Sequence, residues 1–100
     1  MRRVVWSPGA RSELLAIRDY VRAFNVSGAR KLAERLIEAA GNLTEHADRG
    51  RIVRGSVREL VTVRPYIIRY EIADEEVRIL TIRHSARHPE QEPPPSTRAS

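Results

Sequence analysis

The chain has 100 residues, of which 41% are hydrophobic and 31% are charged, the proportions of a single globular domain. The absence of cysteine excludes disulfides and thiolate metal sites, and no apolar run approaches the roughly 20 residues that a membrane-spanning helix needs. A net charge of +5 favours a polyanionic partner: nucleic acid, the ribosome or an acidic protein segment. The apolar stretch at residues 4–6 is too short for a signal-peptide core, so we expect a cytoplasmic protein without a membrane partner.

A short strand and a helix are predicted at the N-terminus. Residues 2–6 are rich in β-branched and aromatic side chains, which favour a strand. Ser7 and Pro8 are typical of a helix start, with Ser7 as N-cap and Pro8 at the first helical position. The apolar residues that follow recur at helical spacing, at Ala10, Leu14, Ile17, Val21 and Phe24. We interpret Trp6 and Phe24 as core residues.

A second helix follows a short break at residues 25–28, where Ser27 is the candidate cap. The wide apolar face of this helix predicts that it packs on a core. That face consists of Ala29, Leu32, Ala33, Leu36, Ile37, Ala40 and Leu43. Because the connection is short, the two helices should form an antiparallel hairpin.

From Gly50 onward the apolar period changes to two, which indicates strands. We predict strands at residues 57–64, 66–73 and 76–84, with residues 51–54 extending the first of them. Pro65 interrupts the first pair, and a tight turn at residues 74–75 joins the second. One face of the middle strand is apolar and consists of Tyr66, Ile68, Tyr70 and Ile72. We interpret Tyr66 and Tyr70 as core residues.

The element order predicts an α+β fold, β-α-α-β-β-β, over residues 1–88. A short N-terminal strand and an antiparallel helical hairpin pack on one face of a mainly antiparallel sheet, which a three-stranded meander completes. Proline, serine, threonine and charged residues predict a disordered tail at residues 89–100. The sheet face without helices would present arginines to a partner.

Several segments, in their order and spacing, resemble toxins of the ParE/RelE superfamily over residues 3–88. The N-terminal segments are Trp6-Ser7-Pro8 with Ala10, the helix with Leu14, Ile17 and Tyr20, the helix with Ala29, Leu32, Ile37 and Leu43, and Gly50-Arg51. The C-terminal segments are Arg58-Glu59-Leu60, Tyr66-Ile67-Ile68-Arg69-Tyr70, and Ile79 to His84 followed by Arg87. The resemblance implies a type II toxin that an antitoxin neutralises, often by wrapping across the hairpin and the sheet edge.

The superfamily contains two activities, which leaves the target open. ParE-like members poison DNA gyrase and have no recognised hydrolytic site, whereas RelE-like members are ribosome-dependent ribonucleases that cut mRNA. RNA cleavage by the 2′-hydroxyl needs a base, an acid and cations at one phosphate. The candidate residues for that chemistry are Glu59, Arg69, His84 and Arg87. The structural interpretation, which we favour, places Glu59 in an ion pair near Arg69 and His84 against the sheet end with a backbone hydrogen bond.

Three departures from the RelE-like pattern favour the ParE-like activity. Ile67 stands where RelE-like nucleases carry a cation, and Ser85-Ala86-Arg87 stand where several members place a tyrosine. The only lysine, Lys31, lies in the second predicted helix. We therefore predict a non-hydrolytic gyrase inhibitor. The alternatives are a RelE-like endoribonuclease, and a basic interaction domain without toxicity.

The predicted partners are an acidic antitoxin and DNA gyrase, or the ribosome with mRNA in the alternative. Residues 49–88 carry a net charge of +4. The predicted binding surface consists of Arg51, Arg54, Arg58, Arg69, Arg83 and Arg87. We expect a toxin–antitoxin hetero-oligomer. We expect no cofactor, because no glycine-rich phosphate loop is present, and no metal, because His46, His84 and His88 lack ligand spacing.

Overall fold

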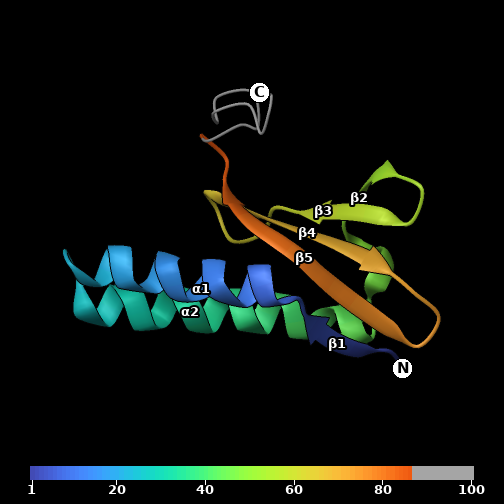
Figure 1. The fold of residues 1–100 in the computed structure, drawn as a ribbon, viewed down its shortest axis with the longest axis horizontal. Coiled ribbons are helices and arrows are strands. Elements are labelled where there is room, and N and C mark those ends of the chain that lie inside the picture. The colour runs from blue at the N-terminus through green and yellow to red at the C-terminus, as the bar shows by residue number, and fades with distance from the viewer. Residues whose placement is uncertain (87–100) are drawn as a thin grey trace.

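The computed structural model describes residues 1–86 and has the predicted α+β architecture (Figure 1). The N-terminal half contains β1 (Arg3–Trp6), α1 (Pro8–Arg22), α2 (Val26–Gly41) and two 3-10 turns, Asn42–Thr44 and Ala47–Arg49. The C-terminal half contains β2 (Arg51–Arg54), β3 (Val57–Leu60), β4 (Tyr66–Ile72) and β5 (Glu76–His84). Arg87, the predicted domain boundary at residue 88 and the predicted tail at residues 89–100 lie outside the described residues.

The sheet has the strand order β1-β5-β4-β3-β2. Strands β2 to β5 form an antiparallel meander, and β1 pairs in parallel with β5. Residues 51–54 form a strand of their own rather than an extension of the next one, because Gly55 adopts a positive φ of 50° at the turn into β3. The first predicted meander strand was also too long: β3 ends at Leu60, and a hydrogen bond from the Tyr66 amide to the Val63 carbonyl closes the turn that follows.

Side chains cap both helices at their N-termini. The Ser7 hydroxyl accepts a hydrogen bond from the Ala10 amide at 3.0 Å, as predicted, and donates to the Leu80 carbonyl of β5. The prediction of Ser27 as the second cap was wrong, because α2 begins before it. Asn25 is the cap, and its side-chain oxygen accepts from the Gly28 amide at 2.9 Å. Among residues 1–86, neither helix is long and apolar enough to cross a membrane.

The core lies where the C-terminal half of α2 and the following turn meet the sheet. Its fully buried side chains from the helical layer include Leu36 and Leu43, and those from the sheet include Ile68, Tyr70, Val77 and Ile79. The predicted apolar face of β4 is confirmed, and Trp6 packs against the core. The prediction of Phe24 as a core residue was wrong, since it is 76% exposed. It lies at the end of the hairpin, which projects beyond the sheet (Figure 1).

Tyr70 anchors the loop that leads into β2. Its hydroxyl donates to the Ala47 carbonyl at 2.7 Å and accepts from the Gly50 amide at 2.8 Å. No side chain fits at Gly50, because a Cβ there would lie 2.6 Å from the Glu59 carbonyl oxygen and 2.7 Å from the Tyr70 hydroxyl. This close contact fixes β2 against β3 and so positions the charged residues of both strands.

Candidate functional site

Three charged residues on neighbouring strands form a row across the sheet. Arg51 of β2 lies opposite Glu59 of β3, which lies opposite Arg69 of β4. Both Nε and Nη2 of Arg69 donate to Oε2 of Glu59, at 3.1 and 2.5 Å, and Nη2 of Arg51 lies 3.4 Å from Oε1. Because Arg69 alternates with the inward-facing Ile68 and Tyr70, the row lies on the face turned away from the core. We call this side of the sheet the outer face.

Glu59 is ionised in this setting. Among residues 1–86 it is the only charged side chain in the buried class, with 9% of the residue exposed. Burial raises the pKa of the Glu59 carboxyl, but the hydrogen bonds and charges of Arg69 and then of Arg51 outweigh burial and hold the pKa below its ordinary value of 4.5. The carboxylate is therefore a stable acceptor for two arginines and a weak base.

The other predicted binding residues divide between the two faces. Arg54 lies opposite Val57, and Arg83 lies opposite Ile67, so both belong to the outer face with Arg69. Arg58 belongs to the opposite face, because it lies opposite Tyr70. Its guanidinium donates to the carbonyls of Asp48 and Gly50, at 3.1 and 2.7 Å, which gives it a role in holding the loop before β2.

His84 is on the core side of the sheet, away from Glu59 and Arg69. It lies opposite Tyr66, and the two rings meet edge to face with centroids 5.3 Å apart. Its Nδ1 accepts a hydrogen bond from the Ala86 amide at 3.1 Å. These contacts agree with the structural interpretation of His84. The structure thus brings Glu59 and Arg69 together but separates both from His84 by the thickness of the sheet.

A groove between α1 and the end of β5 was not found by sequence reasoning. It encloses about 640 Å³. Its walls are Glu13, Ala16, Ile17 and Tyr20 of α1 together with Tyr66, Ile82, Arg83, His84 and Ala86. One oxygen of Glu13 accepts from the Thr81 hydroxyl at 2.7 Å and from the Ile82 amide at 2.9 Å, which joins α1 to the part of β5 beyond its pairing with β1.

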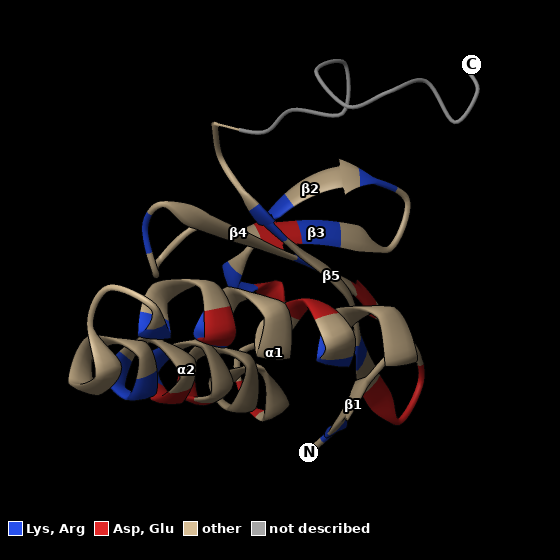
Figure 2. Ribbon diagram, turned by 60° about the vertical axis from the view of Figure 1, so that its left-hand side comes forward, with Lys and Arg blue, Asp and Glu red and all other residues tan. Residues whose placement is uncertain are grey.

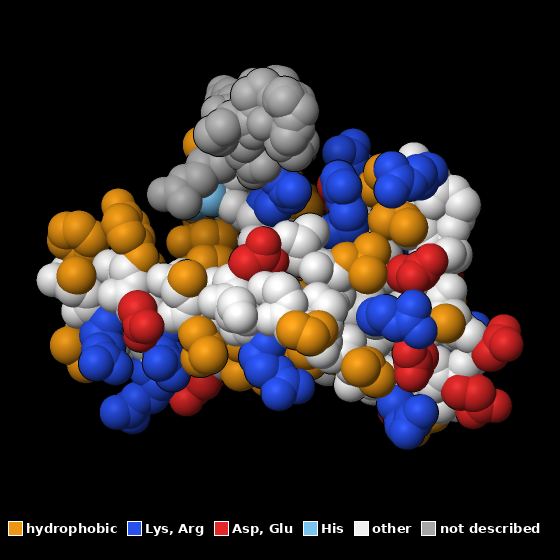
Figure 3. Space-filling view, in the orientation of Figure 1, with side chains coloured by type: hydrophobic (Ala, Val, Ile, Leu, Met, Phe, Trp, Pro, Cys, Tyr) orange, Lys and Arg blue, Asp and Glu red, His pale blue; other side chains and the backbone are white. Residues whose placement is uncertain are grey.

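Exposed aromatic side chains extend this groove along the hairpin. Tyr20, 61% exposed, meets the ring of Phe24 edge to face at 5.5 Å. Figure 3 shows hydrophobic side chains gathered over this end of the hairpin. The sequence signal for the groove was the helical spacing of Ile17 and Tyr20 of α1 and of Phe24 just after it, which we had assigned in part to the core. An exposed apolar surface of this kind is typical of a protein-binding site.

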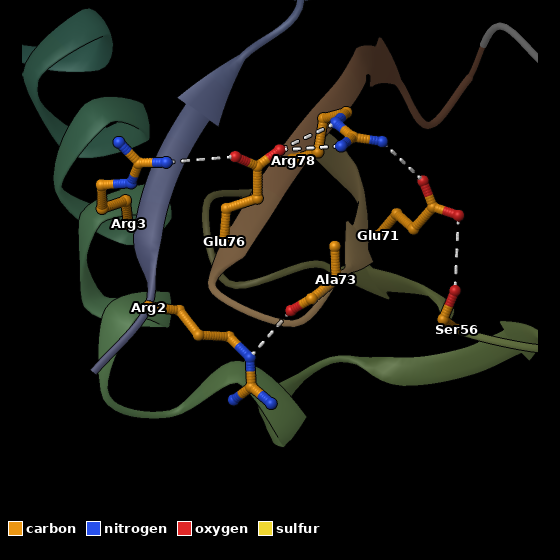
Figure 4. Close-up of polar contacts among 7 residues, drawn as sticks. All are labelled: Arg2, Arg3, Ser56, Glu71, Ala73, Glu76 and Arg78. Atoms are coloured by element: carbon orange, nitrogen blue, oxygen red, sulfur yellow. Dashed lines mark hydrogen bonds and ion pairs between the residues drawn. The ribbon is translucent and has the colours of Figure 1, made fainter.

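Ion pairs neutralise the other end of the outer face. Arg78 of β5 pairs with Glu71 at 3.4 Å and with Glu76 at 2.7 Å, and Glu76 lies 3.7 Å from Arg3 (Figure 4). Acidic residues therefore pair with cations near the β4–β5 turn. Figure 2 shows acidic and basic residues side by side on the strands of the sheet. Within residues 1–86, no three acidic or histidine side chains gather in a way that could hold a metal ion.

Residues 4–89 match the family described as ParE toxin of type II toxin-antitoxin system, parDE. The chain belongs to this family. The toxin is similar to a Caulobacter vibrioides protein named Toxin RelE2, with 48% identity over 87 residues, which cover 87% of this chain and 99% of that protein. Its fold is similar to a solved structure described as the chromosomal ParDE TA system from P. aeruginosa. That similarity has a TM-score of 0.74 and 25% identity, and it covers 84% of this chain and 96% of the other.

These comparisons confirm the resemblance to ParE/RelE toxins that the sequence suggested. The toxin is a component of a type II toxin–antitoxin system, a class whose members pair with a cognate antitoxin. Both relatives match over most of their own length, so the described fold corresponds to nearly all of each.

Proposed function

We propose that this toxin acts in the cytoplasm by binding and inhibiting DNA gyrase, without cutting RNA, and that its cognate antitoxin blocks this activity. The separation of Glu59 and Arg69 from His84 by the sheet is the observation that carries the proposal. Cleavage at the 2′-hydroxyl requires a base and an acid on either side of the same phosphate. Groups on opposite faces of a sheet do not meet one phosphate.

The outer face also lacks the cation that the resemblance to RelE-like nucleases leads one to expect. Ile67 occupies that position, directly opposite Arg83. An aliphatic side chain does not offset the negative charge that develops on the phosphorane. Glu59, held ionised by two arginines, is a weak base there. Binding to a topoisomerase depends on none of these groups.

Two assays on the purified toxin test the proposal. The toxin should inhibit DNA supercoiling by gyrase, and it should leave mRNA in the ribosomal A site uncut. The His84→Ala variant should inhibit gyrase as the unmodified toxin does. Codon-positioned mRNA cleavage that His84→Ala abolishes would instead support the RelE-like alternative. Inactivity in both assays, with no growth inhibition on induction, would support the non-toxic interaction domain.

The same surfaces support an acidic antitoxin as the partner. The groove beside α1 offers apolar side chains, and the outer face offers Arg54, which Glu59 does not contact. An acidic, partly disordered segment that folds on the toxin would bury the apolar surface and form charge-assisted hydrogen bonds with arginines.

A further inference from the structure

The carboxylate of Glu59 occupies the centre of an otherwise basic part of the outer face. Arg51 and Arg69 flank it, and Arg54 and Arg83 lie on the same face. Glu59 is buried but the Arg51 side chain is 79% exposed, and an ion pair with an exposed arginine adds little to stability.

The contacts that Glu59 accepts are those that a phosphate would accept. Arg69 presents a fork of Nε and Nη2 to a single oxygen, and Arg51 adds a donor to the other oxygen. Arginine binds carboxylate and phosphate through the same planar fork. A phosphate of a nucleic acid would have to displace a carboxylate that the fold already holds in place, and the remaining negative charge would repel it.

We propose that Glu59 is an internal counter-ion that prevents the outer face of the sheet from binding single-stranded nucleic acid. With Glu59 in place, Arg51 and Arg69 are neutralised. Without it, Arg51 and Arg69 would join Arg54 in a phosphate-binding surface. This inference concerns selectivity, and it holds whichever protein is the toxin's target.

The test compares two variants that change the net charge equally. Glu59→Gln keeps the shape of the side chain and releases both arginines. Glu71→Gln, on the same face, leaves the Glu59 contacts intact and removes one of the two acidic partners of Arg78. Binding of a fluorescent 12-nucleotide single-stranded RNA is measured by anisotropy over a range of salt concentrations.

We expect Glu59→Gln to bind the RNA about tenfold more tightly than Glu71→Gln near 0.1 M salt. With two more phosphates neutralised, the plot of log affinity against log salt should steepen by about 1.4. Adding Arg51→Gln and Arg69→Gln to Glu59→Gln should abolish the gain. Equal affinities of the two single variants, or a gain that survives loss of both arginines, would overturn the proposal.

A second comparison remains informative if Glu59→Gln does not fold. In the otherwise unmodified toxin, Arg51→Gln and Arg54→Gln each remove one exposed arginine from an end of β2. Since Glu59 already neutralises the first, Arg51→Gln should lower the RNA affinity less than twofold, and Arg54→Gln should lower it several-fold. Equal losses would contradict the role of Glu59. Because RNA affinity is the only readout, the result is independent of the gyrase assay.

Discussion

A single hydroxyl, that of Tyr70, holds the loop before β2 to the rest of the sheet. Its ring is fully buried and its oxygen bridges the Ala47 carbonyl and the Gly50 amide. Tyr70→Phe removes both hydrogen bonds and leaves two buried backbone groups without a partner. We expect a loss of about 1–3 kcal/mol in the free energy of unfolding, measured by urea denaturation.

The control for Tyr70 is Tyr20→Phe, which removes a hydroxyl from a largely exposed ring. It should change the stability by no more than about 0.5 kcal/mol. A stability of Tyr70→Phe equal to that of Tyr20→Phe would mean that water replaces the tyrosine oxygen in the loop.

The lowered pKa of Glu59 makes the free energy of unfolding depend on pH in the acid range. Its pKa is lower in the folded protein than the ordinary 4.5, so the unfolded chain binds a proton more readily than the folded protein. The contribution of Glu59 is therefore fully present above that value and is lost as the pH falls through the folded pKa. Glu59→Gln should be less stable than the unmodified toxin at pH 7, and the difference should shrink below about pH 4.5 in urea melts at each pH. A difference that stays constant between pH 7 and pH 3 would contradict the ion pairs.

At the scale of elements, two neighbouring residues of α2 show which part of the hairpin belongs to the core. Leu36 is fully buried, whereas Ile37 is 50% exposed. Leu36→Ala should lower the free energy of unfolding by about 2–5 kcal/mol, because it leaves a cavity in the core. Ile37→Ala should cost less than about 1 kcal/mol. Similar urea midpoints for the two variants would show that the helix is rotated relative to this structure.

The sequence predicted the elements well where one face of each is buried. On β4 the alternation of Tyr66, Ile68 and Tyr70 identified the inward face, because a shift of one residue would expose all three. The ion pair of Glu59 and Arg69 was predicted from the sequence, because the two residues lie on consecutive predicted strands. Its place on the outer face depends on the register of β3 with β4, which no single strand encodes.

Features that depend on tertiary placement could not be predicted. Ile37 and Phe24 satisfy the helical spacing as well as Leu36 does, yet both are exposed. Ile37 lies on the side of α2 next to the buried Leu36, and Phe24 follows α1 at the end of the hairpin that projects beyond the sheet. The groove exists because β1 pairs with β5 only as far as Ile79, so that α1 runs beside the rest of β5. The separation of His84 from Glu59 follows from the register of three strands.

At the scale of the whole molecule, two surfaces of different chemistry lie on different sides of β5. The core side carries the apolar groove beside α1, and the outer face carries the arginine row. Arg83 connects them, because it lies on the outer face and also lines the groove. An antitoxin segment that follows the groove and crosses the end of β5 would contact both surfaces.

A negative charge in the groove should weaken binding of an acidic antitoxin. Tyr20→Asp changes an exposed side chain that lines the groove, and Leu15→Asp changes a 44% exposed side chain of α1 that does not line it. Because Tyr20→Asp removes apolar contact and adds repulsion, we expect it to weaken the binding more than tenfold. Leu15→Asp should stay within about threefold of the unmodified toxin.

Co-expression with the product of the gene that neighbours the toxin gene, followed by pull-down and calorimetry, measures this difference. Growth should resume when the antitoxin is produced with Leu15→Asp, whereas Tyr20→Asp should remain toxic, because its antitoxin site and not its fold is damaged. Equal weakening by both variants would place the antitoxin elsewhere on the hairpin. If no neighbouring product binds the unmodified toxin more tightly than about micromolar, an acidic antitoxin is not its partner.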